Sequence, residues 1–401
     1  MSRVLIADKL PATAVEALIR LGLEVDVKPG MKPDELGPAL AGVSVLIVRS
    51  TKVPRDVILG AEKLALIVRA GAGVNTIDVA AASERGVYVS NCPGKNAIAV
   101  AELAMGMICA VDRRIPDNVV DFRRGLWKKG EYGKARGLYG RSLGLAGLGR
   151  IGEAVAERAA AFGMHVSAWS RSLTTEIARA KQVEFAGTLR ELASRVEILS
   201  VHLPLTNETR GIIGRPILEA LGPGKVLINT SRAEVVDEPA LIEAVKDRGL
   251  RAGLDVFEGE PTGSTGEIHS PLASLAGVYV SHHIGASTEQ AQEAIMEETI
   301  RIVTAHARGT PIPNCVNIAR QTPARFALVV RHRDRPGVLA AVLGALKSRT
   351  INVEQMQNDV FEGARAACAR IGLDEAAGDD VLAEVRAHPE VIDATVVALS
   401  H

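Results

Sequence analysis

Three polar clusters in the second half of the chain combine an arginine, several carboxylates and two histidines. They are Asn229-Thr-Ser-Arg232, Asp255-Val-Phe-Glu-Gly-Glu260 and His282-His283, and each ends or follows a short apolar run. Arginine can grip a carboxylate through two parallel hydrogen bonds, and histidine can exchange a proton near neutral pH. A carboxylate beside the histidine would favour the protonated imidazole and orient its ring. Together these residue types suit proton transfer at a hydroxyl or carbonyl group of an acidic substrate.

Each cluster also has a plain structural interpretation. Asp255 could simply cap a turn, and Glu258 and Glu260 could be solvated loop charges, which is the usual position of acidic side chains. The chemical interpretation depends on whether the fold brings the three clusters together.

A glycine-rich segment could bind a cofactor that takes part in this chemistry. Leu143-Gly-Leu-Ala-Gly147-Leu-Gly149-Arg-Ile-Gly152 follows an apolar run and precedes a predicted helix over Glu153–Phe162. In the pattern GxGxxG, the first glycine allows a tight turn, the second lets the backbone approach a pyrophosphate, and the third lets helix and strand pack closely. The free N–H groups at the helix N-terminus then face the anion. The segment predicts a dinucleotide site, and a nicotinamide there could accept hydride from a 2-hydroxy acid.

The segment after the next predicted strand lacks the acidic residue that usually holds the ribose 2′-hydroxyl. The chain has Ser170-Arg171 there. A serine and an arginine could receive a 2′-phosphate, so NAD and NADP both remain open. Arg171 could also be a solvated loop residue or stack on the adenine.

Short apolar runs alternate with longer amphipathic stretches along most of the chain. Buried parallel strands joined by helices have this pattern, so we predict two doubly wound α/β lobes. Long helices are expected over 96–110 and 290–307, and Arg123–Gly130 is expected to be a surface connection. A small α+β module with the order βαββαβ should follow, with a strand at Phe326–Val330 and a helix at Gly337–Ser348. The other strands are expected at Arg3–Ala7, Glu24–Val27, Val43–Val48, Leu64–Val68, Val87–Val89, Ser142–Ala146, His165–Trp169, Glu197–His202, Val226–Asn229, Ala252–Val256 and Val278–Ser281.

The composition excludes several classes of protein. The 401 residues carry 47 basic and 47 acidic side chains, so nothing indicates a nucleic-acid or membrane-surface partner. No apolar run reaches membrane-spanning length, and the N-terminus lacks the layout of a signal peptide. The four cysteines are scattered without a CxxC, which is typical of reduced thiols in a cytoplasmic protein. No metal site is expected.

The segments GLGRIG, INTSRAEVVDEPAL, GLDVFEGEP and SHHIGASTEQAQ closely resemble the NAD(P)-dependent D-isomer-specific 2-hydroxyacid dehydrogenases. The resemblance covers essentially the whole chain. It implies that Arg232 binds substrate, that His283 rather than His282 is the catalytic histidine, and that Glu260 is its partner. His282, one residue earlier on a strand, should then have its side chain on the opposite side and a structural role. Asp255 would lie near the nicotinamide carboxamide. The substrate carboxylate would meet Asn75 and the backbone of Ala70, Gly71, Ala72 and Gly73, and Arg49 would bind a phosphate.

The resemblance also implies a discontinuous substrate lobe of residues 1–98 and 286–318, with a Rossmann-type cofactor domain of residues 99–285 inserted into a flavodoxin-like lobe. Relatives form dimers or tetramers through the cofactor domain. We expect the cofactor to contact Gly147, Gly149, Arg150, Ile151, Gly152, Ser170, Arg171, His202, Leu203, Pro204, Thr209, Thr230, Ser231, Arg232, Asp255, His283, Gly285 and Ala286.

The C-terminal module, residues 322–401, resembles an ACT domain. In serine-inhibited relatives, paired ACT domains bind the amino acid between them, and His332, Asp334 and Asn352 match positions used there. Asp334 stands where those relatives have an asparagine. Feedback by serine and an ACT domain that only forms an interface both remain open.

Within this resemblance, the segments LIVRSTKV and IVRAGAGVNTID together with the C-terminal module narrow the expected substrate to 3-phospho-D-glycerate, which would be oxidised to 3-phosphohydroxypyruvate in the first step of serine biosynthesis. Two alternatives remain. One is reduction of glyoxylate or hydroxypyruvate, with NADPH possible because of Ser170-Arg171. The other is an NAD(H)-sensing binding protein that resembles the C-terminal binding corepressors.

Overall fold

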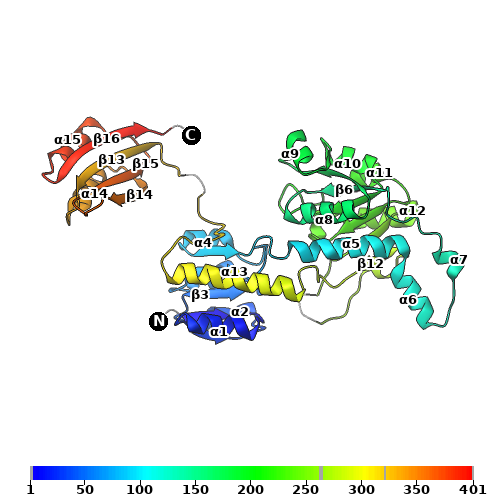
Figure 1. The fold of residues 1–401 in the computed structure, drawn as a ribbon. Helices are drawn as coiled ribbons and strands as arrows, with labels where there is room; N and C mark the ends of the chain where they lie inside the picture. The colour runs from blue at the N-terminus through cyan, green and yellow to red at the C-terminus, as the bar shows by residue number, and fades with distance from the viewer. Residues whose placement is uncertain (1–2, 262–264, 320–321, 400–401) are drawn as a thin grey trace. The chain divides into compact units, whose positions relative to one another are not determined.

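The computed structural model describes residues 3–261, 265–319 and 322–399. These residues form two compact units, one that ends at Asn317 and one that begins at Ile318. The first unit contains a five-stranded and a seven-stranded sheet, both parallel, and the second contains a four-stranded antiparallel sheet (Figure 1). The predicted fold class is therefore confirmed.

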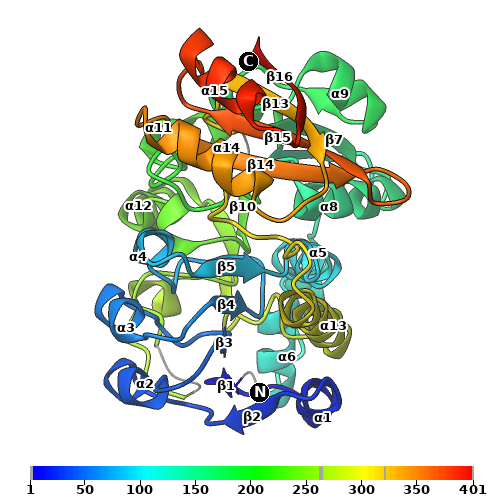
Figure 2. The ribbon, with the colours of Figure 1, turned by 90° about the vertical axis from the view of Figure 1, so that its left-hand side faces the viewer.

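The first sheet has the flavodoxin-like order β2-β1-β3-β4-β5. Successive residues of β1 point to opposite faces. Val4 and Ile6 pack towards α1 and α13, whereas Leu5 packs towards α2, α3 and α4 (Figure 2). The elements of this lobe are β1 (Arg3–Ile6), α1 (Ala12–Arg20), β2 (Glu24–Val27), α2 (Pro33–Ala39), β3 (Val45–Val48), α3 (Arg55–Gly60), β4 (Leu66–Arg69), α4 (Val79–Glu84) and β5 (Tyr88–Asn91).

The second sheet has the order β12-β11-β10-β9-β6-β7-β8, so the strand order reverses between β6 and β9. Ligands of open α/β sheets bind at the carboxyl ends of strands beside such a reversal. The elements are β6 (Ser142–Ala146), α8 (Arg150–Ala161), β7 (His165–Trp169), α9 (Thr175–Ala180), β8 (Glu184–Phe185), α10 (Leu189–Arg195), β9 (Ile198–Val201), α11 (Arg215–Leu221), β10 (Val226–Asn229), η1 (Ala233–Val235), α12 (Glu238–Arg248), β11 (Arg251–Leu254), η2 (Pro271–Ser274) and β12 (Val278–Val280).

Two long helices connect the lobes of the first unit. Helix α5 (Ala97–Arg113) packs on β10 and β11 of the second sheet, and α13 (Glu289–Ala307) packs on β4 and α1 of the first. The chain after α13 then runs along β5. Cys315 forms an isolated antiparallel β-bridge with Ser90, and the side chain of Asn317 accepts a hydrogen bond from the Val89 N–H at 2.9 Å. The polypeptide thus leaves the first lobe, builds the second and returns.

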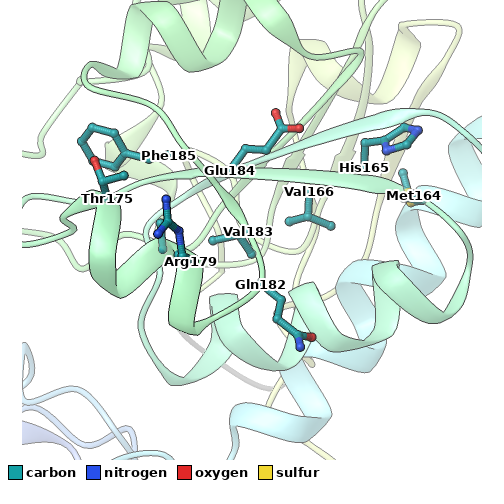
Figure 3. A pocket seen from close by; sticks show the side chains of 10 residues that line it. Met164, His165, Val166, Thr175, Arg179, Gln182, Val183, Glu184 and Phe185 are labelled. Carbon is teal, nitrogen blue, oxygen red and sulfur yellow. The ribbon is translucent and has the colours of Figure 1, made fainter.

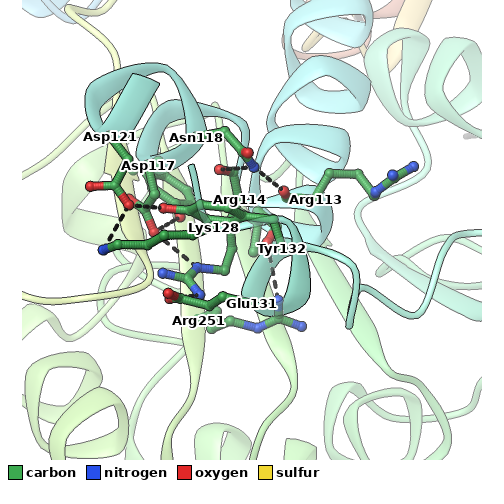
Figure 4. A network of polar contacts seen from close by, with 11 residues as sticks. Arg113, Arg114, Asp117, Asn118, Asp121, Lys128, Glu131, Tyr132 and Arg251 are labelled. Atoms are coloured by element: carbon green, nitrogen blue, oxygen red, sulfur yellow. Dashed lines mark hydrogen bonds and ion pairs between the residues drawn. The ribbon is translucent and has the colours of Figure 1, made fainter. Parts of the chain in front are cut away.

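Arg123–Gly130, predicted to be a surface connection, is exposed and joins two short helices that were not predicted, α6 (Ile115–Arg123) and α7 (Lys129–Tyr132). Arg114 adopts the left-handed conformation, with φ of 51°, which ends α5 and lets α6 begin at once. A polar network then holds both helices (Figure 4): Arg114 pairs with Asp117 at 2.9 Å and with Glu131 at 2.8 Å. We call α6, α7 and their connection the arm.

The second unit has the predicted order βαββαβ. Its sheet order is β14-β15-β13-β16, and both helices pack on one face of that sheet. The elements are β13 (Phe326–Arg333), α14 (Val338–Lys347), β14 (Val353–Val360), β15 (Ala366–Leu373), α15 (Asp379–Ala387) and β16 (Val391–Ala398).

Four predicted strands, β2, β6, β7 and β10, have the predicted bounds. Helix α8 begins at Arg150 instead of Glu153, and the two-residue strand β8 had no recognisable pattern. None of the helices in the described residues is both long enough and apolar enough to cross a membrane.

Candidate active site

The three glycines after β6 have the geometry that a dinucleotide requires. Gly147 has a φ of +103°, and a Cβ there would lie 2.7 Å from the carbonyl oxygen of His202. A Cβ on Gly149 would have no neighbour within 4 Å, which leaves open space in front of the backbone, and one on Gly152 would collide with the Gly147 carbonyl. No side chain caps the N-terminus of α8, so its N–H groups are free for an anion.

Two buried polar atoms at the ends of nearby strands, β9 and β10, lack a hydrogen-bond partner among the described residues. They are Nδ1 of His202 and Oγ1 of Thr230. The other ring nitrogen of His202 pairs with Oγ of Ser200 at 2.9 Å, and burial lowers the pKa of His202 to about 4. A neutral imidazole and a hydroxyl without partners fit a polar ligand. The glycines and these two atoms therefore fit a nicotinamide dinucleotide.

The remaining predicted cofactor residues lie around the same strand ends. Ser170 is half-buried and Arg171 exposed, directly after β7. Thr209 stabilises the loop after β9 by donating a hydrogen bond to the carbonyl of Pro204 at 2.6 Å. The guanidinium of Arg150 donates to the Pro93 carbonyl. This contact links the glycine-rich turn after β6, which we call the glycine cradle, to the segment between β5 and α5. Ile151 is half-buried in α8, and Leu203 is buried after β9.

The three chemical clusters are brought together because β10, β11 and β12 are neighbouring parallel strands. Nδ1 of His283 lies 2.7 Å from Oε2 of Glu260, whose Oε1 accepts the Phe257 N–H at 2.9 Å. The hydrogen bond to Glu260 raises the pKa of His283; burial and the charge of Arg232 oppose this, and Asp255 adds to it. Burial alone would raise the pKa of Glu260, but its hydrogen bonds and the charge of His283 lower it overall. A carboxylate–imidazole pair of this kind can store and release a proton.

Asp255 fixes the loop that carries His283. The carboxylate is buried, and its Oδ1 accepts the Ser281 hydroxyl at 2.5 Å and the Ile284 N–H at 2.9 Å, while Oδ2 accepts the Gly285 N–H at 2.8 Å. His283 itself has a φ of 52°, a left-handed conformation that non-glycine residues adopt only when their surroundings hold them. The side chain that was expected near the nicotinamide therefore also shapes the histidine loop.

The prediction for His282 rested on a wrong premise. We placed it on a strand, one residue before His283, with its side chain on the opposite side and a structural role. Strand β12 ends at Val280, so both histidines lie beyond it and strand alternation does not apply. His282 is exposed and its ring makes no hydrogen bond to another described residue. The contact with Glu260 is what distinguishes His283.

Arg232 faces the loop of the first lobe that was predicted to receive the substrate carboxylate. Asn229 shapes the arginine's own loop by accepting the Ser231 N–H at 3.0 Å and donating to the Arg232 carbonyl at 2.9 Å. A Cβ on Gly73 would lie 2.8 Å from Nη2 of Arg232 and 3.0 Å from Oδ1 of Asn75. Glycine at position 73 thus leaves the space into which the guanidinium reaches.

Sequence reasoning missed Arg69, the last residue of β4. Its Nε is buried and has no partner in the described part of the chain, and a Cβ on Gly71 would overlap its guanidinium. Burial and then the charges of Arg232 and Arg49 lower the pKa of Arg69 to about 10. The available signal was its place at the carboxyl end of a parallel strand, where ligands of such sheets bind.

Asp8, which follows β1, was also missed. Its Oδ2 accepts three successive backbone N–H groups, from Arg49 at 2.6 Å and from Ser50 and Thr51 at 3.1 Å each. It thereby fixes the start of the loop after β3 and the position from which the Arg49 side chain departs. The order of this sheet reverses between β1 and β3, so Asp8 and Arg49 lie where a ligand is expected.

The predicted effector residues lie in the second unit, with His332 in β13, Asp334 just after that strand and Asn352 just before β14. His332 is buried, and its ring nitrogens pair with the Arg333 carbonyl at 2.8 Å and with Oδ1 of Asn358 at 3.1 Å. Asp334 and Asn352 are exposed, and the side chain of Asn352 donates to Glu354 at 2.8 Å. His332 therefore has no free ring nitrogen for an effector in this conformation.

A pocket elsewhere on the second lobe is separate from these residues. Figure 3 shows it between the start of β7, the edge strand β8 and α9, where His165, Arg179 and Glu184 contribute to its lining. It shares no residue with the clusters described above. Across the described ranges, no three His, Cys, Asp or Glu side chains are grouped so that they could bind a metal ion.

A dinucleotide cradle beside an arginine, a glutamate and a histidine defines an NAD-dependent oxidoreductase that acts on a CH–OH group. Residues 105–285 match the NAD-binding domain of the D-isomer-specific 2-hydroxyacid dehydrogenases. The chain belongs to this family, as its sequence motifs predicted.

Curated relatives show the range of substrates within the family. The chain is 38% identical to D-3-phosphoglycerate dehydrogenase of Methanocaldococcus jannaschii over 93% of this chain and 67% of that one. It is 40% identical to hydroxypyruvate reductase of Thermotoga maritima over 74% of this chain and 96% of that one. A solved structure of NAD⁺-bound 3-phosphoglycerate dehydrogenase from Entamoeba histolytica is 28% identical, with a TM-score of 0.66 over 79% of this chain and 99% of that one.

Proposed function

We propose that this enzyme oxidises 3-phospho-D-glycerate to 3-phosphohydroxypyruvate with NAD⁺. The observation that carries the proposal is a group of three arginines, Arg49, Arg69 and Arg232, around the loop after β4. The guanidinium of Arg69 lies against Gly71 and Nη2 of Arg232 reaches Gly73, and the charges of Arg232 and Arg49 lower the pKa of Arg69. No carboxylate among the described residues forms a salt bridge with any of them. A phosphate monoester carries roughly −1.5 to −2 charges at neutral pH, and a carboxylate adds one more. A substrate with both groups would balance the three cations.

The reaction removes a hydride and a proton from the C2 carbon and its hydroxyl group. When NAD⁺ is bound, its nicotinamide supplies the hydride acceptor. In our proposal, His283 takes the hydroxyl proton as a general base, and Glu260 holds the ring and stabilises the imidazolium that forms. Arg232 binds the substrate carboxylate and polarises the oxygen that becomes the carbonyl. The backbone of Ala70–Gly73 and Asn75 completes the carboxylate site, and Arg49 and Arg69 hold the phosphate.

A substrate panel tests this proposal. We expect 3-phosphohydroxypyruvate to be reduced with NADH, followed at 340 nm, at a higher kcat/KM than hydroxypyruvate or glyoxylate. Replacing Arg49 with glutamine should lower kcat/KM for the phosphorylated substrate by roughly 10- to 150-fold, the value of a hydrogen bond to a charged group. Hydroxypyruvate, which lacks the phosphate, should be turned over by this variant much as by the wild type.

The matched control is Arg20→Gln, which removes an exposed arginine at the end of α1. It should leave all rates unchanged. If hydroxypyruvate or glyoxylate is the preferred substrate, or if Arg49→Gln lowers all rates equally, the phosphate assignment is wrong.

NADPH in place of NADH tests whether Ser170-Arg171 admits a 2′-phosphate. An absence of turnover with every 2-oxo acid would favour a nucleotide-sensing protein.

We further propose that two copies of the chain associate through the arm. Phe122 and Trp127 are 72% and 78% exposed, and Ile115, Val119 and Leu126 lie around the same surface pocket. Clustered exposed apolar side chains of this kind mark interaction surfaces. The polar network of Figure 4 keeps the arm rigid, which limits the entropy lost on association.

The double variant Phe122→Ser/Trp127→Ser should therefore sediment as a smaller species than the wild type in analytical ultracentrifugation. Ile177→Ser is the control, because Ile177 is 44% exposed on α9, away from the arm. It should sediment as the wild type does. A wild-type protein that sediments as a monomer at micromolar concentration would rule out this interface.

For the second unit we propose a regulatory role as an ACT-like module. The βαββαβ order supports it. Adding L-serine to the assay above distinguishes feedback inhibition, seen as a lowered rate, from a module that only forms an interface, seen as an unchanged rate.

A further inference from the structure

The loop that carries Glu260 is held at two successive backbone N–H groups. The Phe257 N–H donates to Glu260 itself at 2.9 Å, and the Glu258 N–H donates to Oε2 of Glu238 at 2.7 Å. Glu238 is the first residue of α12, outside the three chemical clusters. A carboxylate from helix α12 thus binds the Glu258 N–H, which directly follows the Phe257 N–H that orients Glu260.

Glu238 is buried, and its carboxylate accepts a hydrogen bond from the Glu258 N–H. Acidic residues are common in the first turn of a helix, where they interact favourably with the macrodipole while exposed to solvent. Glu238 is only 8% exposed and forms no salt bridge with any cation in the described ranges. Burial and the charge of Glu258 raise the pKa of Glu238, while the Glu258 N–H opposes them. Burying a carboxylate costs free energy, and the hydrogen bond from the Glu258 N–H offsets part of that cost.

We infer that Glu238 is a positioning residue for the reaction: by holding the Glu258 N–H, it fixes the loop so that Glu260 meets His283. This inference rests on the proposed roles of Glu260 and His283. The connection is short. Glu238 contacts residue 258, residue 257 contacts Glu260, and Glu260 lies 2.7 Å from the histidine ring.

Loss of the Glu238 contact should move the Glu260 carboxylate away from the imidazole. The charged groups that act on His283 are Glu260, Asp255 and Arg232. Asp255 and Arg232 are held by their own loops, so only the contribution of Glu260 should fall. The pKa of His283 should then decrease, and kcat should fall more than KM rises, because substrate binding by Arg232 is preserved.

Kinetics and NMR of two variants test the inference. Glu238→Ala removes the acceptor, and Glu238→Asp keeps a buried carboxylate but is one methylene too short to reach the Glu258 N–H. Both should lower kcat by about 10- to 100-fold, the effect of a misplacement of about 1 Å. Both should also lower the pKa of His283, measured by NMR on protein with ¹³C-labelled histidine and assigned with His283→Gln. Glu238→Gln keeps an acceptor oxygen and should restore kcat to within about threefold of the wild type.

The control is Glu243→Ala, on the same helix, where the exposed Glu243 pairs with Arg215. It should change neither kcat nor the pKa of His283. Folded Glu238→Ala and Glu238→Asp proteins with wild-type kcat and an unchanged His283 pKa would overturn the inference. If instead His283→Ala retains full turnover, the proposed function fails, yet the NMR titration of the Glu238 variants still reports whether Glu238 positions the loop.

Discussion

Replacing His283 with alanine is expected to lower kcat by about 10²- to 10⁴-fold, which is the usual contribution of a positioned acid or base. The dinucleotide should still bind, because the glycine cradle and the N-terminus of α8 lie after a different strand, β6. NADH affinity, measured by its fluorescence, should therefore change far less than kcat. The imidazole is the only proton acceptor that the described residues bring next to Glu260, and this is why the effect should be large.

The pH dependence of the oxidation and reduction rates gives a second test of the Glu260–His283 pair. Oxidation needs the neutral imidazole, so its rate should fall as pH decreases through the pKa of His283. Reduction needs the imidazolium, so its rate should fall as pH increases through that pKa. Glu260 raises the pKa of His283 above its ordinary value of about 6.5. Glu260→Gln should therefore shift both limbs to lower pH and lower the rate of reduction near neutral pH.

His282→Ala is the matched control, because it removes an exposed imidazole one residue away. It should retain kcat and the wild-type pH profile. Equal losses in His282→Ala and His283→Ala would mean that the loop, not the ring of His283, matters. Full activity of His283→Ala would falsify the proposed mechanism.

The parts of the site that the sequence predicted depend on local spacing. The three glycines of GLGRIG each serve a distinct steric need, so their spacing alone identifies the turn, the open backbone and the close packing. The clusters after β10, β11 and β12 were predictable because parallel strands end at one edge and consecutive strands of such lobes are often neighbours. This rule brings the regions of Arg232, Glu260 and His283 together, and the resemblance to the family supplied their expected roles.

The parts that it missed depend on tertiary burial. Arg69 resembles any polar residue that ends a strand, and only the folding of the loop from Ala70 to Asn75 over it makes its charge significant. Glu238 resembles an ordinary first-turn acid until the loop after β11 packs against it. The resemblance selected His283 over His282, but the expected orientation of His282 depended on where β12 ends, and the ends of elements are the least predictable feature of a pattern.

Replacing Asp112 with alanine is expected to destabilise the second lobe by about 3 kcal/mol, the low end of the cost of breaking a buried ion pair, because Glu197 stays 3.6 Å from Nε of Arg141. Asp112 and Arg141 have side chains only 2% and 4% exposed, and they pair at 2.7 Å. The other carboxylate oxygen accepts the Gly137 N–H at 3.0 Å, so Asp112 also anchors the chain where the arm returns to β6. Burial lowers the pKa of Arg141, and Asp112 opposes this, which shows how much the buried guanidinium depends on its partner.

Urea unfolding followed by tryptophan fluorescence measures this loss directly. Both tryptophans of the chain, Trp127 and Trp169, lie in the arm and at the end of β7, so the signal reports the second lobe. Glu243→Ala is the control: Glu243 pairs with Arg215 at the surface of the same lobe, with both side chains about half exposed, and its loss should cost less than about 1 kcal/mol. A loss in Asp112→Ala no larger than that in Glu243→Ala would mean that solvent or Glu197 compensates the guanidinium of Arg141 once Asp112 is gone. Because the arm also carries Phe122 and Trp127, a destabilised return segment should weaken self-association in the same variant, which ties the stability of the lobe to the proposed interface.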